Sequence, residues 1–209
     1  LTLVDPDNRR PVDFHLRARL LAELDERIAR STSPFVAATP ERELARPVGG
    51  ADRRRLELLH LADLVGELLE NWQDGRLKLF LTRRALEQRR AYPEIFTSGV
   101  YRALESFGSK RDHVVAFARA SEDLELVVAV PRLVVGLTGE ATVLPLGCQT
   151  WEDTAIDVGD GAMGEQYENV LTGQRVSVVG CDGRLVVRLA DVFDVCPVAL
   201  LRRGRPASG

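Results

Sequence analysis

Residues 113–130 read His-Val-Val-Ala-Phe-Ala-Arg-Ala-Ser-Glu-Asp-Leu-Glu-Leu-Val-Val-Ala-Val, and this stretch decides the fold class of the second half of the chain. It contains two β-prone runs, at 113–120 and 124–130, which the turn-forming residues Ser-Glu-Asp separate. The alternation at Val115 and Phe117 and the apolar run at 127–130 are typical of strands with at least one buried face. The stretch therefore predicts two strands of an all-β region.

Further short β-prone runs lie on both sides of this stretch, and turn-forming residues separate them. Asp182-Gly183 is a typical type I′ pair, so it predicts a hairpin between Val178-Val179 and Leu185-Val186. We therefore expect an antiparallel β-sandwich over residues 96–209. The other predicted runs lie at 100–106, 132–137, 155–158, 174–179 and 185–189.

Before residue 96 the apolar residues recur at helical spacing instead. A first helix is predicted around 16–28, with Asp13 as its N-cap and a turn-forming cluster at its end. Residues 35–50 contain two prolines and a Gly-Gly pair, which predict a long loop. Helices followed by strands indicate an α+β chain or two domains.

Two more helices are predicted after this loop. Asp52 is expected to cap the first of them, whose apolar face extends to Trp72 and which Asp74-Gly75 closes. The next helix is predicted over 76–90, with Leu86 on its apolar side, and it ends before Pro93.

Composition excludes several classes of function. The chain has 209 residues, 45% of them hydrophobic and 28% charged, which is typical of a globular protein with one sizeable core or two small ones. A formal net charge of −3 gives no basic field for a polyanion, so nucleic acid is not expected as a partner. No long apolar run and no signal-peptide pattern occurs, so no membrane partner is predicted and the cytoplasm is the expected compartment.

Neither metal nor cofactor chemistry is predicted. Cys148, Cys181 and Cys196 lie far apart and form no C-x-x-C pair, so they predict neither a disulfide framework nor a zinc site. The three histidines are not clustered at ligand spacing, and no serine stands in a nucleophile-elbow context. Trp151 is open to two interpretations, stacking on a sugar ring or packing in the core of the sandwich.

The tract 3–13 reads Leu-Val-Asp-Pro-Asp-Asn-Arg-Arg-Pro-Val-Asp and displays polar side chains on stiff backbone. Pro6 and Pro11 fix their own φ angles and push Asp5 and Arg10 out of the helical region. Arginine forks and carboxylates each make two parallel hydrogen bonds to neighbouring hydroxyl oxygens, so the tract suits sugar recognition. The alternative is a turn that leads into a helix N-cap, since the same residue types form both.

A family resemblance is carried by this tract, by a stretch from Trp72 through 74–82 to Leu86, Arg89 and Pro93, and by shorter matches downstream. The shorter matches lie at Tyr101 and Leu104, 113–119, 130–133, Trp151 with Asp153-Thr154, 171–173 and 197–201. In this order they resemble the end of the catalytic barrel and the C-terminal domain of maltooligosyl trehalose synthases, enzymes of the α-amylase superfamily. The resemblance covers nearly the whole chain.

This resemblance implies that residues 1–95 complete the end of a (β/α)8 barrel, with a helical insertion, and that 96–209 form the C-terminal β-sandwich domain. It implies a glucosylmutase, an isomerase that converts the reducing-end α-1,4 linkage of a maltooligosaccharide to α-1,1 by intramolecular transglucosylation. The implied partners are the maltooligosaccharide and the remainder of the barrel.

The resemblance also suggests the site residues. Active sites of such barrels collect at the carboxyl ends of the strands, so Asp7, Asn8, Arg9 and Arg10 are expected to line or brace the substrate pocket. Lys78 begins the last barrel helix near the same rim and is a further candidate. The alternative for Lys78 is a solvated lysine on an amphipathic helix.

No residue of the chain is predicted to be catalytic. The chain begins at Leu1 and its only methionine is Met163, so we expect a piece of a longer protein. In the resembled family seven barrel strands and the catalytic carboxylates precede this region, so the chain is expected to be inactive alone, with apolar surface of the second and third helices exposed. The alternative function is a non-catalytic module that binds an α-glucan or a protein.

Overall fold

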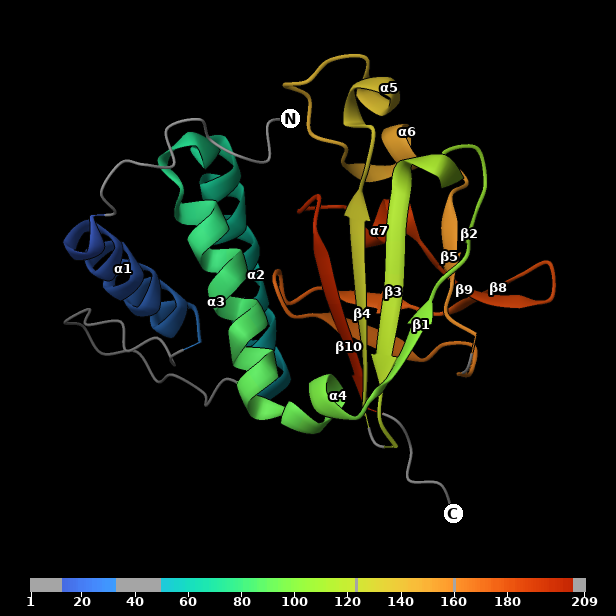
Figure 1. Ribbon diagram of the computed structural model, residues 1–209, viewed down its shortest axis with the longest axis horizontal. Helices are drawn as coiled ribbons and strands as arrows, with labels where there is room; N and C mark the ends of the chain where they lie inside the picture. Colours follow the sequence, from blue (N-terminus) through green and yellow to red (C-terminus); the bar gives the residue numbers. More distant parts are fainter. Residues whose placement is uncertain (1–12, 33–49, 123, 160, 205–209) are drawn as a thin grey trace, which may run out of the picture.

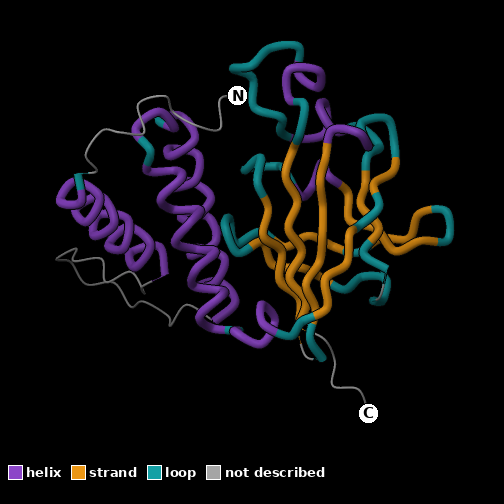
Figure 2. Tube along the Cα trace, in the orientation of Figure 1, coloured by secondary structure: helices purple, strands orange, loops and turns teal. Residues whose placement is uncertain are grey.

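The computed structural model describes residues 13–32, 50–122, 124–159 and 161–204. Long helices lie on one side of the molecule and two antiparallel β-sheets on the other (Figure 1). Figure 2 shows the same division by secondary structure. The predicted combination of helices followed by antiparallel strands is thus confirmed. The predicted domain boundary after residue 95 falls within the short helix α4 (Pro93–Thr97), and it stays a prediction.

Helix α1 (Phe14–Thr32) begins where its N-cap was predicted. The backbone N–H of Leu16 donates to Oδ1 of Asp13 at 2.8 Å, and the N–H of Arg17 donates to the Asp13 carbonyl at 3.1 Å. Because Asp13 thereby satisfies N–H groups that the first turn leaves without partners, the helix begins after it. Leu24 and Ile28 are buried on its inner side.

Helix α2 (Gly50–Glu70) differs from the prediction at both ends. It begins at Gly50, so Asp52 has helical backbone and is not the N-cap, which must lie outside the helix. Trp72 belongs to a separate 3₁₀ turn, η1 (Trp72–Asp74), where the tighter winding takes it off the buried face, and it is 59% exposed. Gly75 ends this turn at φ 82°, a left-handed conformation that glycine adopts without strain.

Helix α3 (Arg76–Ala91) agrees with its predicted bounds. Phe80 is fully buried, but Leu86 is 52% exposed and does not belong to the apolar side. The reason is geometric, because six residues after Phe80 correspond to about one and two-thirds turns of an α-helix.

The helices pack together and against the β part around one apolar cluster. Residues of β-part loops, Leu171 and Cys196, belong to this cluster, and the Arg84 guanidinium donates to the Val170 carbonyl at 2.7 and 3.2 Å. Arg119 donates to the carbonyls of Ile95 and Phe96. The two parts are therefore joined by packing and by hydrogen bonds. The helical members of the cluster are Leu24, Ile28, Leu61, Leu64, Val65, Leu68, Leu69 and Phe80.

The described strands form two antiparallel sheets, of order β1-β3-β4-β10-β6-β7 and β2-β5-β9-β8. The first contains β1 (Val100–Ala103), β3 (Val114–Ala120), β4 (Leu124–Pro131), β10 (Ala199–Gly204), β6 (Gln166–Asn169) and β7 (Arg175–Ser177). The second contains β2 (Ser106–Phe107), β5 (Ala155–Asp157), β9 (Arg184–Arg188) and β8 (Val179–Cys181). Short helices η2 (Arg111–His113), α5 (Val134–Thr138), α6 (Gly147–Trp151) and α7 (Leu189–Val192) lie between strands.

Two predicted strands and one predicted hairpin are confirmed. Strands β3 and β4 pair along their whole length, with Val115 opposite Val130. Strands β8 and β9 form the predicted hairpin, in which Asp182 and Gly183 have φ angles of 49° and 76°. A type I′ turn requires positive φ at both central residues, so this sequence pair set the hairpin.

Other strand predictions are wrong. The run 132–137 contains α5 instead of a strand, because the left-handed Leu133 (φ 52°) turns the chain away from β4, and β-propensity acts only where a neighbouring strand is present. The run 100–106 is divided between β1 and β2, which belong to different sheets. Strands β6 and β10 carry several polar residues and were not predicted.

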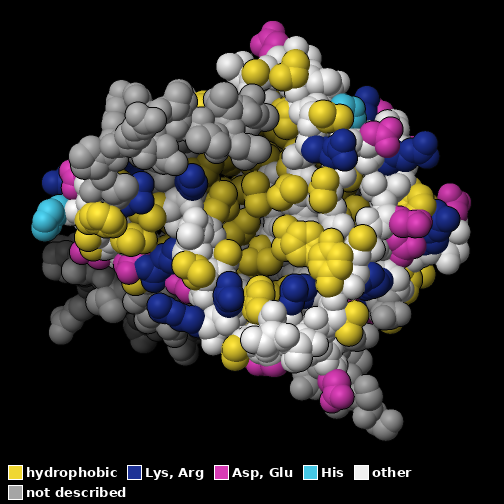
Figure 3. All heavy atoms as spheres, in the orientation of Figure 1, with side chains coloured by type: hydrophobic (Ala, Val, Ile, Leu, Met, Phe, Trp, Pro, Cys, Tyr) yellow, Lys and Arg dark blue, Asp and Glu magenta, His cyan; other side chains and the backbone are white. Residues whose placement is uncertain are grey.

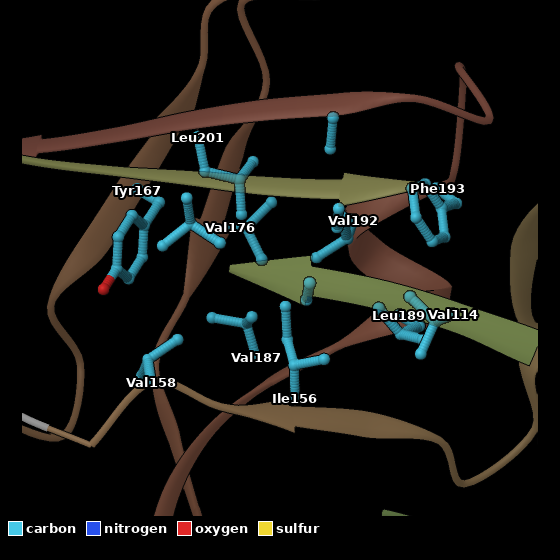
Figure 4. Packing of buried hydrophobic residues seen from close by; sticks show 14 of the residues in the cluster. Val114, Ile156, Val158, Tyr167, Val176, Val187, Leu189, Val192, Phe193 and Leu201 are labelled. Carbon is cyan, nitrogen blue, oxygen red and sulfur yellow. The ribbon is translucent and has the colours of Figure 1, made fainter. Parts of the chain in front are cut away.

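The two sheets share one core (Figure 4). Figure 4 shows Ile156 and Val187 from the four-stranded sheet facing Val176 and Leu201 from the six-stranded one. Trp151 is fully buried in this core, where its Nε1–H donates to the Pro145 carbonyl at 2.8 Å. The core interpretation of Trp151 is therefore confirmed, and sugar stacking is excluded for it.

Candidate functional site

The predicted site residues are only partly within the described structure. Asp7, Asn8, Arg9 and Arg10 lie outside the described residues. Lys78 lies in the first turn of α3 with an exposed side chain, and its backbone carbonyl accepts a hydrogen bond from Thr82 at 2.8 Å. A role for Lys78 in substrate binding stays a prediction.

The most unusual polar feature of the described residues is a carboxylate inside the β core. Glu125 is 1% exposed, and it stands on β4 directly opposite Arg203 of β10. The Glu125 carboxylate accepts from the Arg203 guanidinium at 2.7 Å and from the Arg102 guanidinium at 2.8 Å. Because a charge in a low-dielectric core must be paired, Glu125 and the two arginines form one unit.

Tyr167 and Glu165 complete this unit. The Tyr167 hydroxyl donates to Glu125 at 2.6 Å, and Arg203 also donates to Glu165 at 2.6 Å. Burial, and then the negative charge of Glu125, raise the pKa of Tyr167, so the phenol stays protonated and continues to donate. Gly161 lies so close to Arg203 that a side chain there would collide with the guanidinium.

The polar side chains of this network hydrogen-bond to one another, and their arrangement does not suit acid–base catalysis. Glycosyl transfer with retention needs two carboxyl groups facing a substrate, one as nucleophile and one as acid. Glu125 is buried and held by three donors, and Glu165 is paired with Arg203. We therefore assign the network a structural role, in which it fixes the strands β1, β4, β6 and β10 to one another.

A pocket of about 450 Å³ opens beside the network, where the end of α3 meets β6, β7 and β10. Its lining is largely polar and includes the aromatic residues Tyr92 and Tyr167 together with Arg203 of the buried network. The other polar residues of the wall are Gln166, Glu168, Arg175 and Arg202. None of them was singled out from the sequence. Gln166, Glu168 and Arg202 lie on β6 and β10, which were not predicted, and Arg175 lies in a predicted strand whose pairing with β6 local sequence does not show.

Among the described residues, no group of three or more His, Cys, Asp or Glu side chains is close enough to hold a metal ion. Within the same part of the chain, no helix combines the length and the apolar character that crossing a bilayer requires.

Comparison with known proteins gives related sequences but no match to a protein-family model. Over 155 residues, 73% of the chain, it is 32% identical to proteins assigned as maltooligosyl trehalose synthases in two strains of Mycobacterium tuberculosis, CDC 1551 and H37Rv. The matched region is 13% of the length of those proteins. A solved structure, a variant of maltooligosyltrehalose synthase from Arthrobacter ramosus, matches 95% of the chain and 18% of its own, with 27% identity and a TM-score of 0.49.

Proposed function

Because this chain is homologous to maltooligosyl trehalose synthases over 73% of its length, we propose that it is the C-terminal part of a glucosylmutase. The proposed reaction converts the reducing-end α-1,4 linkage of a maltooligosaccharide into an α-1,1 linkage by intramolecular transglucosylation. The homology is the observation that carries this proposal. The helices would complete the end of a (β/α)8 barrel, and the two sheets would be its C-terminal sandwich.

The chemistry of the proposed reaction indicates which part of the enzyme carries the catalytic carboxylates. Retention requires a carboxylate nucleophile and a carboxylic acid about 5 Å apart, in a pocket that excludes water. The most buried carboxylate of the described residues, Glu125, is already held by three donors. We therefore propose that the catalytic carboxylates belong to another part of the enzyme and that this chain is inactive alone. On the resemblance, Asp7 to Arg10 would line the sugar pocket.

The outer face of the six-stranded sheet supports the proposal that this chain packs against the rest of the enzyme. A solvated antiparallel sheet has polar residues on its outer face, because successive side chains alternate between faces. Here Val115 and Phe117 of β3 lie on the outer face next to Tyr101, Val128 and Val130. Figure 3 shows hydrophobic side chains gathered over the sheet and in the hollow between it and the helices.

We propose that the barrel of the same enzyme packs against this outer face. Val115 is 44% and Tyr101 59% exposed, although the opposite face of the same strands is already packed in the core. The curated relatives are several times longer than this chain, so a large body is present in them to cover such a face. Of the exposed apolar surface that was expected on the second and third helices, the described residues include Leu86 of α3, which is 52% exposed.

Charges placed on the outer face are expected to separate the two parts of the enzyme. In the full-length protein, Tyr101→Asp with Val115→Asp should abolish stable packing of this region, because each buried unpaired charge costs several kcal/mol. Limited proteolysis should then release a fragment of this region from the variant and not from the parent. The control is Met163→Asp, at a 74% exposed apolar residue beside β8. Equal protease resistance of the double variant and the control would contradict the docking face.

The proposed activity is tested by comparing the full-length protein and this chain on maltopentaose. The expected result is an α-1,1-linked product from the full-length protein and none from the chain, with linkage read by NMR. An α-1,1 product from the chain alone would overturn the proposal that the catalytic carboxylates lie outside this chain. A full-length protein that only shortens the α-1,4 chain would overturn the mutase assignment.

A further inference from the structure

Three charged side chains form a row across three neighbouring strands of the six-stranded sheet. Arg202 of β10 stands opposite Glu168 of β6, and Glu168 stands opposite Arg175 of β7. Residues that are directly opposite in an antiparallel pair project from the same face, so the row Arg202, Glu168, Arg175 is continuous. All three residues line the 450 Å³ pocket.

Two further residues extend this row. Gln166 lies two residues before Glu168 on β6, so it projects from the same face, and its side-chain oxygen accepts from Arg175 at 3.4 Å. At the other end, the Tyr92 hydroxyl accepts from Arg202 at 3.2 Å, and the Arg202 guanidinium lies 5.8 Å from the centre of the Tyr92 ring. The wall therefore offers donors and acceptors in alternation and ends in an aromatic ring.

The contacts within the row are long. The Arg202 and Glu168 side chains approach to 3.5 Å, and the two hydrogen bonds of the row measure 3.2 and 3.4 Å. Hydrogen bonds of this length are at the weak end of the range. The Arg202 and Glu168 side chains are 27% and 29% exposed, so solvent also weakens the attraction between their charges. Arg202 also donates to the Gln88 side chain, at 3.4 Å. Because these hydrogen bonds are all long, the guanidinium groups of Arg202 and Arg175 can turn toward a ligand at small cost. Arg203 behind them is already held by Glu125 and Glu165.

The alternation of donors and acceptors along the row decides which class of ligand suits the pocket. A phosphate or carboxylate accepts only, so it would gain from Arg202 and Arg175 but would be repelled by Glu168 between them. A sugar hydroxyl both donates and accepts, and vicinal hydroxyls match a guanidinium next to a carboxylate. The Tyr92 ring offers an apolar surface to the carbon-bound hydrogens of a pyranose.

We infer that this pocket is a saccharide-binding site, in which Arg202, Glu168 and Arg175 hold vicinal hydroxyls and Tyr92 packs against a ring. That the saccharide is an α-1,4-glucan rests on the proposed function, whereas the preference for a polyhydroxylated ligand rests on the pocket alone. The same site would serve the alternative in which the chain is a non-catalytic α-glucan-binding module.

The site is tested by titrating the chain with maltopentaose, cellopentaose and inorganic phosphate in separate calorimetric experiments. Maltopentaose is expected to bind, and Arg175→Ala and Tyr92→Ala are each expected to weaken its binding about tenfold, as loss of a charged hydrogen bond or of ring packing does. The control is Arg188→Ala, an exposed arginine on β9 of the other sheet, which should leave binding unchanged. Circular dichroism melting checks that each variant is folded.

The outcomes separate this inference from the proposed function. Cellopentaose could bind in place of maltopentaose, with the same sensitivity to Arg175→Ala. This result would support a saccharide site in the pocket and would contradict the assignment of its ligand as an α-1,4-glucan. Binding of phosphate alone, or saccharide binding that Arg188→Ala weakens as much as Arg175→Ala, would overturn the pocket. Loss of mutase activity in the full-length assay would leave these titrations unaffected, because they measure binding to the chain.

Discussion

Replacing Glu125 by glutamine is expected to lower the free energy of unfolding by about 3 kcal/mol, because it removes the negative charge of a buried ion pair and so weakens what holds the Arg203 guanidinium in the core. Glutamine has the shape of glutamate, so the change acts on charge and hydrogen bonding and creates no cavity. The measurement is urea unfolding of the chain followed by circular dichroism, with the midpoint and slope fitted separately. A large part of the total stability of a small domain would be lost.

Glu87→Gln is the matched control for this experiment. Glu87 pairs with Arg83 and Arg84 on α3 at 2.9 and 2.8 Å, and its side chain is 34% exposed. Because exposed pairs contribute about 0–1 kcal/mol, the control should change stability little. A loss at Glu125 no larger than that of the control would show that the buried network does not hold the strands together.

The second large effect is expected at Trp151. Trp151→Ala should cost about 4 kcal/mol of unfolding free energy, because it empties the space beside Phe193 and leaves the Pro145 carbonyl without its donor. The other tryptophan gives a matched control, since Trp72 is 59% exposed. Trp72→Ala should change stability by about 0.5 kcal/mol or less.

Both tryptophan variants are measured by the same denaturant unfolding. Fluorescence adds a check, because the blue-shifted emission of a buried indole should disappear in Trp151→Ala and persist in Trp72→Ala. The reverse order of destabilisation would contradict the buried position of Trp151 in the shared core.

The site itself was less accessible to sequence reasoning than the fold. Lys78 was selected for its place in a family motif, yet the pocket is lined by Arg175, Arg202 and Glu168, which lie on strands β6, β7 and β10. The clearest signal that could have drawn attention to this region was Glu125, a charged residue within an otherwise apolar run. A charge in such a run requires a partner, but its identity cannot be obtained from local sequence.

Local sequence was enough to predict several features of the fold. Asp13 capped α1, Asp182-Gly183 set a hairpin, and the alternation at Val115 and Phe117 predicted a strand, because hydrogen bonds and backbone preferences of this kind reach only a few residues. Glu125 and Arg203 are 78 residues apart and meet only because β10 inserts between β4 and β6. The amino-acid sequence by itself therefore determined the helices, several of the strands and the family. Strand order is a long-range property, and it decided which charges share a core and which line a pocket.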